Sequence, residues 1–312
     1  MRRRLRARGA AVRAAARGRG EIGAGLTIYH RGRCVVDVHG GLADARARRA
    51  WQRDTRVVLF SVTKGLTAMA LHLLADRGQL EWDAPVTTYW PGFGASGKEG
   101  VTVRTLLGHR AGLACLDTPL TLEDCLDPSR AAVVRRALEQ QRPAWAPGAD
   151  QGYHAVTFGL YARELFERVA GEELGPFLRR ELLEPLGSDV WLGTPASEDA
   201  RMAILYPPAA RDRVVQMLGA ALLEPESTEA RVAKALLERG SLGRRAFLNP
   251  SPGKRGVLAY DDPPARRGAL AWASATGSAH GLARAYLPFA SGGAHEGVAT
   301  CAPRRSSRRT RG

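Results

Sequence analysis

The chain has 312 residues, of which 45% are hydrophobic and 25% charged, a composition typical of a globular protein with one large domain or two small ones. No apolar run reaches the ~18 residues that a membrane-spanning helix needs, and residues 1–20 lack the apolar core of a secretory signal. The formal net charge of +15 lies mostly at the two ends, because residues 1–20 carry eight arginines and residues 302–312 carry five. We therefore expect disordered basic tails rather than a specific nucleic-acid site.

The first half of the chain predicts a hairpin followed by a helix. Residues 23–30 and 34–39 have the pattern of two short strands around Arg31-Gly32-Arg33. Apolar residues then recur at helical spacing over 62–76, and Gly78 is a plausible C-terminal stop. Residues 83–100, rich in proline and glycine, have the composition of a loop.

The second half of the chain is predicted to be mostly helical. Helical patterns cover residues 131–141, 153–169, 176–183, 226–238 and 281–289. A connector rich in proline and glycine is expected over 244–264, and the composition changes abruptly to Arg, Ser and Pro after residue 293. We expect one domain over 21–293, flanked by basic tails over 1–20 and 294–312.

The four cysteines of the chain include no C-x-x-C pair. Their spacing supports neither a disulfide framework nor a zinc site. We therefore expect reduced thiols, no bound metal and a cytoplasmic location.

Lys64 stands out because only four of the 46 basic residues are lysines. Arginine stays protonated in proteins and cannot act as a base, whereas lysine can. Lys64 follows Ser61 by three residues at the start of a helical pattern, so the hydroxyl and the amine would share one helix face. This is the arrangement by which a Ser-Lys hydrolase activates its nucleophile.

A simpler interpretation of Ser61 stays open at this point. Serine is a common N-cap residue, so Ser61 could cap the helix and be followed by an incidental lysine. A second S-x-x-K match runs from Ser251 to Lys254, but its proline and glycine are typical of a turn, where the two side chains need not share a face. The spacing alone does not decide between a cap and a nucleophile.

A longer pattern surrounds Ser61. Its segments, in order, are Asp54-Thr55, Phe60 to Lys64, Asp76 to Leu80, Asp83 to Val86, Tyr89 to Pro91, Gly97 to Val103 and Leu106 to Leu113. Together they resemble the serine β-lactamase-related family, which comprises class C β-lactamases, DD-peptidases and carboxylesterases of the same fold. The resemblance continues through Pro147-Gly148 and residues 152–155, and less sharply to about residue 293.

The resemblance implies a fold and a set of catalytic residues. The fold would be of the α+β class, β-lactamase/transpeptidase-like, with an antiparallel sheet, flanking helices and a mostly helical subdomain. Ser61 would be the acyl nucleophile, and Lys64 and Tyr153 would handle the protons. Two proton routes are open: a neutral Lys64 acts as the base, or a charged Lys64 stabilises a Tyr153 tyrosinate that acts as the base. No metal or organic cofactor is implied.

The resemblance also implies a small-molecule ester or amide substrate. The β-lactamases usually have Tyr-x-Asn where this chain has Tyr153-His154-Ala155, as in the esterase-like branch. Loss of the Asn amide, which could hold a lactam side chain, favours esters over lactams and peptides. We expect His154 to face the cleft and His109 to be a loop or packing residue.

The third motif of the family, Lys-Thr-Gly or His-x-Gly on a C-terminal strand, has no clear match. The nearest candidates are His280-Gly281 and His295-Glu296-Gly297. We therefore expect the C-terminal strands to be missing through truncation or a frameshift, which would leave the 23–39 hairpin with little to pair with. Loss of one oxyanion donor costs roughly 10² to 10³ in rate, so weak or absent activity is expected. The alternative is a non-catalytic binding protein or an inactive gene product.

The motifs of two other protein classes, nucleotide-binding proteins and α/β-hydrolases, are incomplete or absent in the sequence. Residues 92–98 fit the phosphate-loop pattern G-x-x-x-x-G-K, but Glu99 stands where Ser or Thr is required. The G-x-S-x-G elbow of the α/β-hydrolases does not occur.

Overall fold

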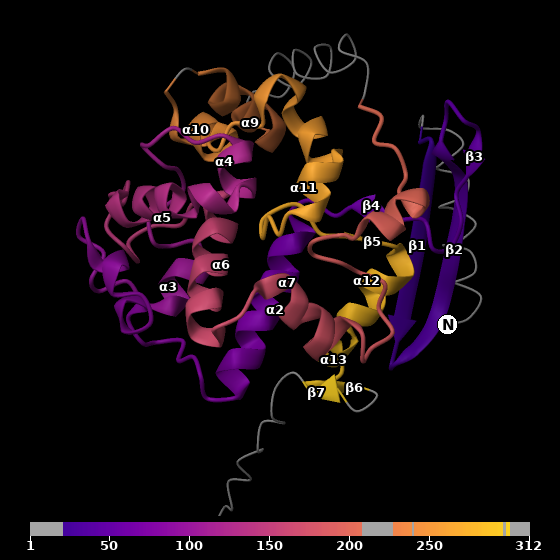
Figure 1. Cartoon of the computed structure of the whole chain (residues 1–312), viewed down its shortest axis with the longest axis horizontal. Coiled ribbons are helices and arrows are strands. Elements are labelled where there is room, and N and C mark those ends of the chain that lie inside the picture. Colours follow the sequence, from indigo (N-terminus) through magenta and orange to yellow (C-terminus); the bar gives the residue numbers. More distant parts are fainter. Residues whose placement is uncertain (1–20, 208–226, 239, 296–297, 300–312) are drawn as a thin grey trace, which may run out of the picture.

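The computed structural model describes residues 21–207, 227–238, 240–295 and 298–299. A group of helices forms one side of the molecule and a small antiparallel sheet the other, as Figure 1 shows. The predicted basic tail over 1–20 lies outside the described residues, and so does the tail over 294–312 except for 294–295 and 298–299. None of the helices in the described ranges is long and apolar enough to cross a bilayer.

The sheet begins with the predicted hairpin. Strand β1 (Gly23–His30) pairs antiparallel with β2 (Arg33–Asp44). Arg31 and Gly32 both have positive φ, 49° and 72°, which is the geometry of a two-residue type I′ turn that matches the twist of the strands. Strand β2 runs past the predicted end at residue 39, because its last residues pair with the start of β1 and with β3 (Arg49–Ala50).

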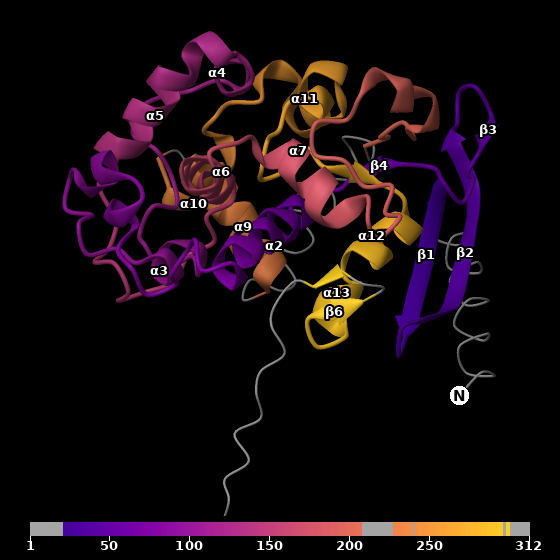
Figure 2. The same ribbon diagram turned by 60° about the horizontal axis from the view of Figure 1, so that its bottom comes forward.

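The hairpin has more support than the sequence indicated. Besides β3, helix α12 (Ala279–Ala285) packs against β1, and the two lie side by side in Figures 1 and 2. The contact is close, since a Cβ added at Gly25 would lie 3.3 Å from the Ala279 methyl. The strand pairing itself is as sparse as expected, because among the described residues the sheet is β1-β2-β3 and no strand from the C-terminal half joins it. The packing of α12 is the support that the sequence did not indicate.

Helix α2 (Val62–Asp76) forms as predicted and occupies the centre of the molecule (Figure 2). Its apolar side chains are buried, with Leu66 and Leu71 fully enclosed. The helix ends in a Schellman motif, in which Gln79 N–H donates to Leu74 O (2.9 Å) and Gly78 N–H to Ala75 O (3.1 Å). Gly78 is the required residue there because its φ is +71°.

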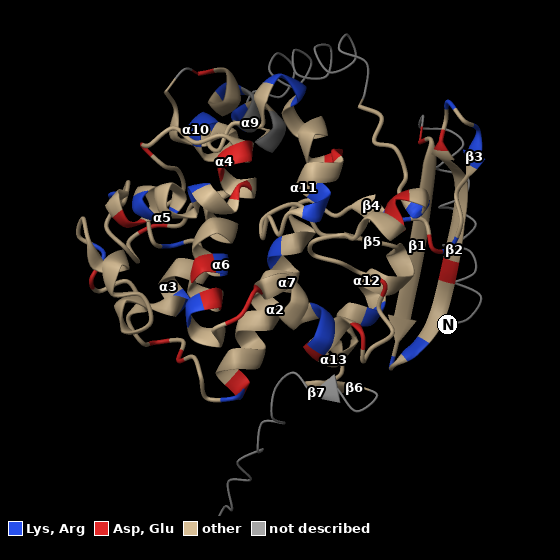
Figure 3. Cartoon of the chain, in the orientation of Figure 1, with Lys and Arg blue, Asp and Glu red and all other residues tan. Residues whose placement is uncertain are grey.

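The other helices surround α2 and provide most of the core. They are α3 (Val103–Leu107), α4 (Leu122–Leu126), α5 (Ala131–Gln140), α6 (Thr157–Ala170), α7 (Leu174–Leu178) with a π-helical turn (Arg179–Leu183), α9 (Thr228–Leu237), α10 (Leu242–Leu248), α11 (Pro263–Arg267) and α13 (Leu287–Ala290). Short strands β4 (Val57–Val58) and β5 (Thr276–Gly277) pair beside α2, and β6 (Ala294–His295) pairs with β7 (Val298–Ala299). Basic and acidic residues are interspersed over the helices in Figure 3.

Two of the predicted segments differ clearly from the structure. Helix α6 begins at Thr157 and not at 153, because the backbone before it is held in a loop: Gly152 N–H donates to His109 O at 3.1 Å. The expected 244–264 connector is largely helical, with α10, a 3₁₀ segment (Gly253–Asp261) and the start of α11. Proline is compatible with a helix there, because Pro263 stands in the first turn of α11, where a missing N–H costs nothing.

Lys98 is fully buried and organises the loop over 83–100. Its Nζ donates to the carbonyl oxygens of Ala95, Glu139 and Gln141 at 2.5 to 2.8 Å. The ammonium group therefore ties this loop to the C-terminal end of α5. Because all three donors are used inside the protein, Lys98 is not available to a phosphate group.

Replacing Lys98 by methionine is expected to lower the free energy of unfolding by about 3 kcal/mol, because buried carbonyls would lose their donor. Urea denaturation measures the loss. Lys254→Met is the matched control, since Lys254 is exposed and its replacement should change stability by less than about 0.5 kcal/mol. Equal stability of the two variants would contradict the assigned role of Lys98.

Candidate active site

Ser61 stands on a sharp turn at the start of α2. The preceding Phe60 has φ of +44°, a conformation that is strained for an aromatic residue. The turn is anchored to the segment beside β5, because Leu59 N–H donates to Ala275 O at 2.8 Å. Its effect is to present an exposed Ser61 at the helix N-terminus, where the helix dipole stabilises negative charge.

The capping interpretation of Ser61 is wrong. Its backbone is already helical (φ −63°, ψ −10°), and its side chain accepts no capping hydrogen bond. An N-cap serine would instead have an extended backbone and accept a hydrogen bond from an N–H of the first turn. The Ser61 hydroxyl is therefore directed at other side chains.

Lys64 lies one helical turn after Ser61 and is almost completely buried. Its Nζ donates to Ser61 Oγ at 3.1 Å and to the carbonyl oxygen of Trp272 at 3.1 Å. Burial lowers the pKa of Lys64 from its ordinary value of 10.5 to about 8. A substantial fraction of the amine is thus neutral near physiological pH and able to accept a proton.

Tyr153 reaches the same hydroxyl from a loop before α6. Its Oη lies 2.8 Å from Ser61 Oγ, although 92 residues separate the two in sequence. The ring centroid is 5.1 Å from Lys64 Nζ, within the range of a cation–π contact. The structure thus brings the three predicted site residues together around one oxygen atom.

Two histidines hold the Tyr153 loop in place. His154 is buried, and its two ring nitrogens are engaged: Nε2 accepts from Leu113 N–H (3.0 Å) and Nδ1 donates to Gly152 O (2.5 Å). The prediction that His154 faces the cleft is therefore wrong. His109 Nδ1 in turn accepts from His154 N–H at 3.1 Å, and burial lowers the pKa of His109 to about 4, so His109 is neutral at pH 7.

Trp272 and Gly159 are site residues that the sequence reasoning missed. The Trp272 carbonyl orients Lys64, and α6 packs directly on this segment, since a Cβ at Gly159 would lie 2.4 Å from Trp272 N. Glycine at 159 is thus required for the close approach of helix and backbone. Neither residue belongs to a motif, and a backbone carbonyl leaves no mark in a sequence.

Replacing Gly159 by alanine is expected to shift the Trp272 backbone and, through it, Lys64. A displacement of this kind should lower kcat/KM for an ester about 10- to 100-fold and stability by about 2 kcal/mol. The matched control is Gly171→Ala at the other end of α6, where φ is +69° and stability alone should fall, by about 1 kcal/mol. An unchanged kcat/KM of folded Gly159→Ala would show that the contact does not position Lys64.

Neither candidate for the third motif lies beside Ser61. His280 is on α12, where its Nδ1 is 3.5 Å from Asp37 Oδ2 and its ring centroid 6.0 Å from that of Tyr29. The His295 ring lies against Gly32 in the β1–β2 turn. Both histidines therefore contact the sheet and not Ser61.

One group of potential metal ligands exists among the described residues. The ligand atoms of Cys34, Asp37 and His280 lie within 4.8 Å of one another. However, Arg53 Nε donates to Asp37 at 2.5 Å, and Arg53 Nη2 is 2.9 Å from His280 Nδ1. The guanidinium group already supplies the positive charge there, and we assign no metal to this position.

Comparison with known proteins agrees with this geometry. A protein-family model described as Beta-lactamase matches residues 8–301. A curated relative, "Esterase/beta-lactamase LipL" of Mycobacterium tuberculosis, is 34% identical over 282 residues, which are 88% of this chain and 60% of the relative. The chain thus spans about 60% of the length of that relative.

Solved structures of the same kind of protein also resemble this chain. A family VIII carboxylesterase has a TM-score of 0.76 at 31% identity, covering 95% of this chain and 72% of that one. A penicillin-binding protein homologue from Caulobacter crescentus has a TM-score of 0.73 at 31% identity, covering 95% and 73%. The predicted α+β fold of the β-lactamase/transpeptidase type is therefore confirmed, and the chain belongs to the β-lactamase family.

Proposed function

We propose that this protein is a serine hydrolase that cleaves small-molecule esters through an acyl-enzyme on Ser61. The observation that carries the proposal is the convergence of two proton-handling groups on one hydroxyl: Lys64 Nζ and Tyr153 Oη lie 3.1 and 2.8 Å from Ser61 Oγ. Serine is a poor nucleophile until a neighbour takes its proton, and both neighbours needed are present.

In the proposed first step, Ser61 Oγ attacks the ester carbonyl and neutral Lys64 takes the hydroxyl proton. The carbonyl oxygen becomes an oxyanion at the N-terminus of α2, where the Ser61 N–H and the helix dipole would stabilise it. Neither third-motif candidate lies beside Ser61 to add a second donor, so a rate roughly 10² to 10³ below that of a complete site stays expected. The carbon–oxygen bond to the alcohol then breaks, and the alcohol leaves with a proton delivered through Tyr153. Water hydrolyses the acyl-enzyme in the second step, with Lys64 as the base again, and releases the acid.

An ester is the substrate that the site favours over a lactam. Ala155 stands two residues after Tyr153, is buried and offers no side-chain hydrogen bond. A lactam with an amide side chain would therefore lack a partner at this position. The similarity to a family VIII carboxylesterase supports the same choice, whereas the name of LipL includes both activities.

Rapid-mixing kinetics with p-nitrophenyl acetate test the proposal. We expect a burst of nitrophenolate equal to one per protein chain, followed by slower steady release, because acylation precedes hydrolysis of the same serine. Benzylpenicillin should be hydrolysed much more slowly. Absence of both a burst and turnover in folded protein would contradict the proposal and favour a non-catalytic binding protein.

A further inference from the structure

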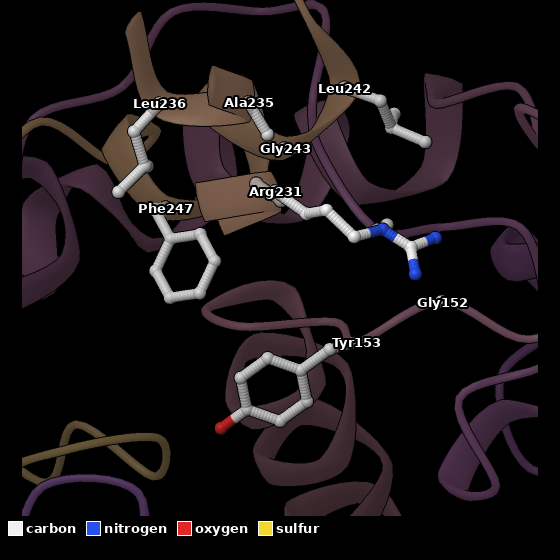
Figure 4. Close-up of a pocket in the computed structure, with 10 residues that line it drawn as sticks. Gly152, Tyr153, Arg231, Ala235, Leu236, Leu242, Gly243 and Phe247 are labelled. Atoms are coloured by element: carbon white, nitrogen blue, oxygen red, sulfur yellow. The ribbon is translucent and has the colours of Figure 1, made fainter. Parts of the chain in front are cut away.

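A cavity lies beside the Tyr153 ring. It has a volume of about 390 Å³ and lies between the Tyr153 loop and the pair of helices α9 and α10, as Figure 4 shows. This volume is at the small end of the range for ligand pockets, so it suits one medium-length chain or one ring. The apolar lining includes Ala114, Leu236, Leu242, Ala246 and Phe247.

Three large apolar side chains of the lining are exposed to solvent. Phe247 is 44% exposed, Leu242 38% and Tyr153 47%. Single exposed apolar side chains are ordinary, but three around one hollow mark a surface that a ligand covers. The rings of Phe247 and Tyr153 have centroids 6.2 Å apart, so they form adjoining walls of the cavity.

Tyr153 joins this cavity to the nucleophile. One face of its ring lines the cavity, and its hydroxyl lies 2.8 Å from Ser61 Oγ. Ser61 itself is not in the lining, so the cavity adjoins the nucleophile through the Tyr153 side chain. This position suits the non-reacting arm of an ester whose carbonyl is at Ser61.

Arg231 is the charged residue of the lining. It belongs to α9 and is exposed, and it forms no ion pair with a side chain in the described part of the chain. In Figure 4 its guanidinium and the Tyr153 hydroxyl point toward opposite ends of the cavity. The cavity thus has a reactive end, an apolar middle and a cationic far end.

We infer that the cavity binds an ester arm made of an apolar chain with a carboxylate at its far end. The inference rests on the proposed function, because it names the substrate class of the same site. Apolar contact with Phe247 and Leu242 would hold the chain, and Arg231 would bind the carboxylate. The arm is on either the acyl or the alcohol side of the ester, and both sides present the same chemistry to the cavity.

Chain length and charge are tested with two ester series. Along p-nitrophenyl esters from acetate to octanoate, kcat/KM should rise about fourfold per added methylene until the cavity is full. Mono-p-nitrophenyl suberate, which has the same length as the octanoate ester and a terminal carboxylate, should react about fivefold faster than it. Octyl acetate and 8-acetoxyoctanoate repeat the comparison on the alcohol side, and the series with the larger charge effect identifies the arm.

Variants on one helix separate the cavity from general charge effects. Arg231→Gln should remove the advantage of suberate over octanoate, whereas Lys234→Gln, which removes a charge of α9 outside the lining, should keep it. Leu242→Trp should reduce the advantage of octanoate over acetate by filling the cavity. Leu237→Trp is its control, because Leu237 is 67% exposed and outside the lining. Equal effects within each pair would overturn the inference.

Binding separates a failure of the cavity from a failure of the hydrolase. Calorimetry of Ser61→Ala with free suberate and octanoate should show suberate binding that Ser61→Ala/Arg231→Gln loses. If the wild type hydrolyses no ester but suberate binds in this way, the inference about the cavity is supported and the proposed function is contradicted. If esters are hydrolysed with a burst but neither chain length nor Arg231 matters, the proposed function stands and the cavity inference is overturned.

Discussion

Replacing Ser61 by alanine lowers kcat for p-nitrophenyl acetate by about 10⁴-fold or more and removes the nitrophenolate burst. The size of the effect follows from the role proposed for Ser61, because loss of the nucleophile leaves only binding and the oxyanion site. Stability should change by less than about 0.5 kcal/mol, since the side chain is exposed and caps no helix. Steady-state kinetics and urea denaturation of the same sample measure both quantities.

The matched control for this change is the second S-x-x-K serine. Ser251 Oγ accepts a hydrogen bond from Gly253 N–H at 3.2 Å, as expected for a turn. Ser251→Ala should therefore keep the burst and the turnover of the wild type. Activity that survived in Ser61→Ala would show that another group attacks the ester.

Replacing Lys64 by arginine lowers kcat/KM about 10³-fold, although the positive charge is kept. Arginine cannot give up its proton at any ordinary pH, so the base of the proposed mechanism is lost. Had a Tyr153 tyrosinate been the base, a cation at position 64 would still stabilise it, and activity would largely survive. The substitution thus decides between the two proton routes that the sequence left open, and Lys254→Arg is the exposed control.

The pH profile gives a second measure of the same role. The pKa of Lys64 is about 8, and a base acts only in its unprotonated form. In the wild type, kcat/KM should therefore rise about tenfold per pH unit below pH 8 and level off above it. In Lys64→Arg the profile should lose this rise. A wild-type profile that is flat from pH 6 to 9 would contradict a basic role for Lys64.

The Ser61–Lys64 pair could be predicted from the sequence because the two residues share one helix. Residue spacing on a helix fixes which side chains are neighbours, and the pattern of α2 is clear from Val62 to Gly78. Tyr153 could not be found in this way, since 92 residues separate it from Ser61. Its role came only from the resemblance to a family.

The remaining errors have physical causes. His154 was expected beside Tyr153 in the cleft, but neighbouring residues in an extended loop point to opposite sides, and His154 is buried where Tyr153 is exposed. Trp272 acts through a backbone carbonyl, which any residue has. The cavity wall is made by α9 and α10 after residue 226, where only packing in three dimensions brings Phe247 to Tyr153.

The domain limits at residues 21 and 293 stay predictions. Residues 1–20 and 300–312 lie outside the described residues. Within the predicted tail over 294–312, the described strands β6 and β7 pair with each other, with Ala294 opposite Ala299.

Covalent labelling tests the central claim most directly. The folded protein is incubated with a fluorophosphonate probe, its intact mass is measured, and the modified peptide is sequenced by mass spectrometry. The account predicts one adduct per chain on Ser61, present in Ser251→Ala and absent from Ser61→Ala. An adduct on any other residue, or none on the folded wild type, would contradict it.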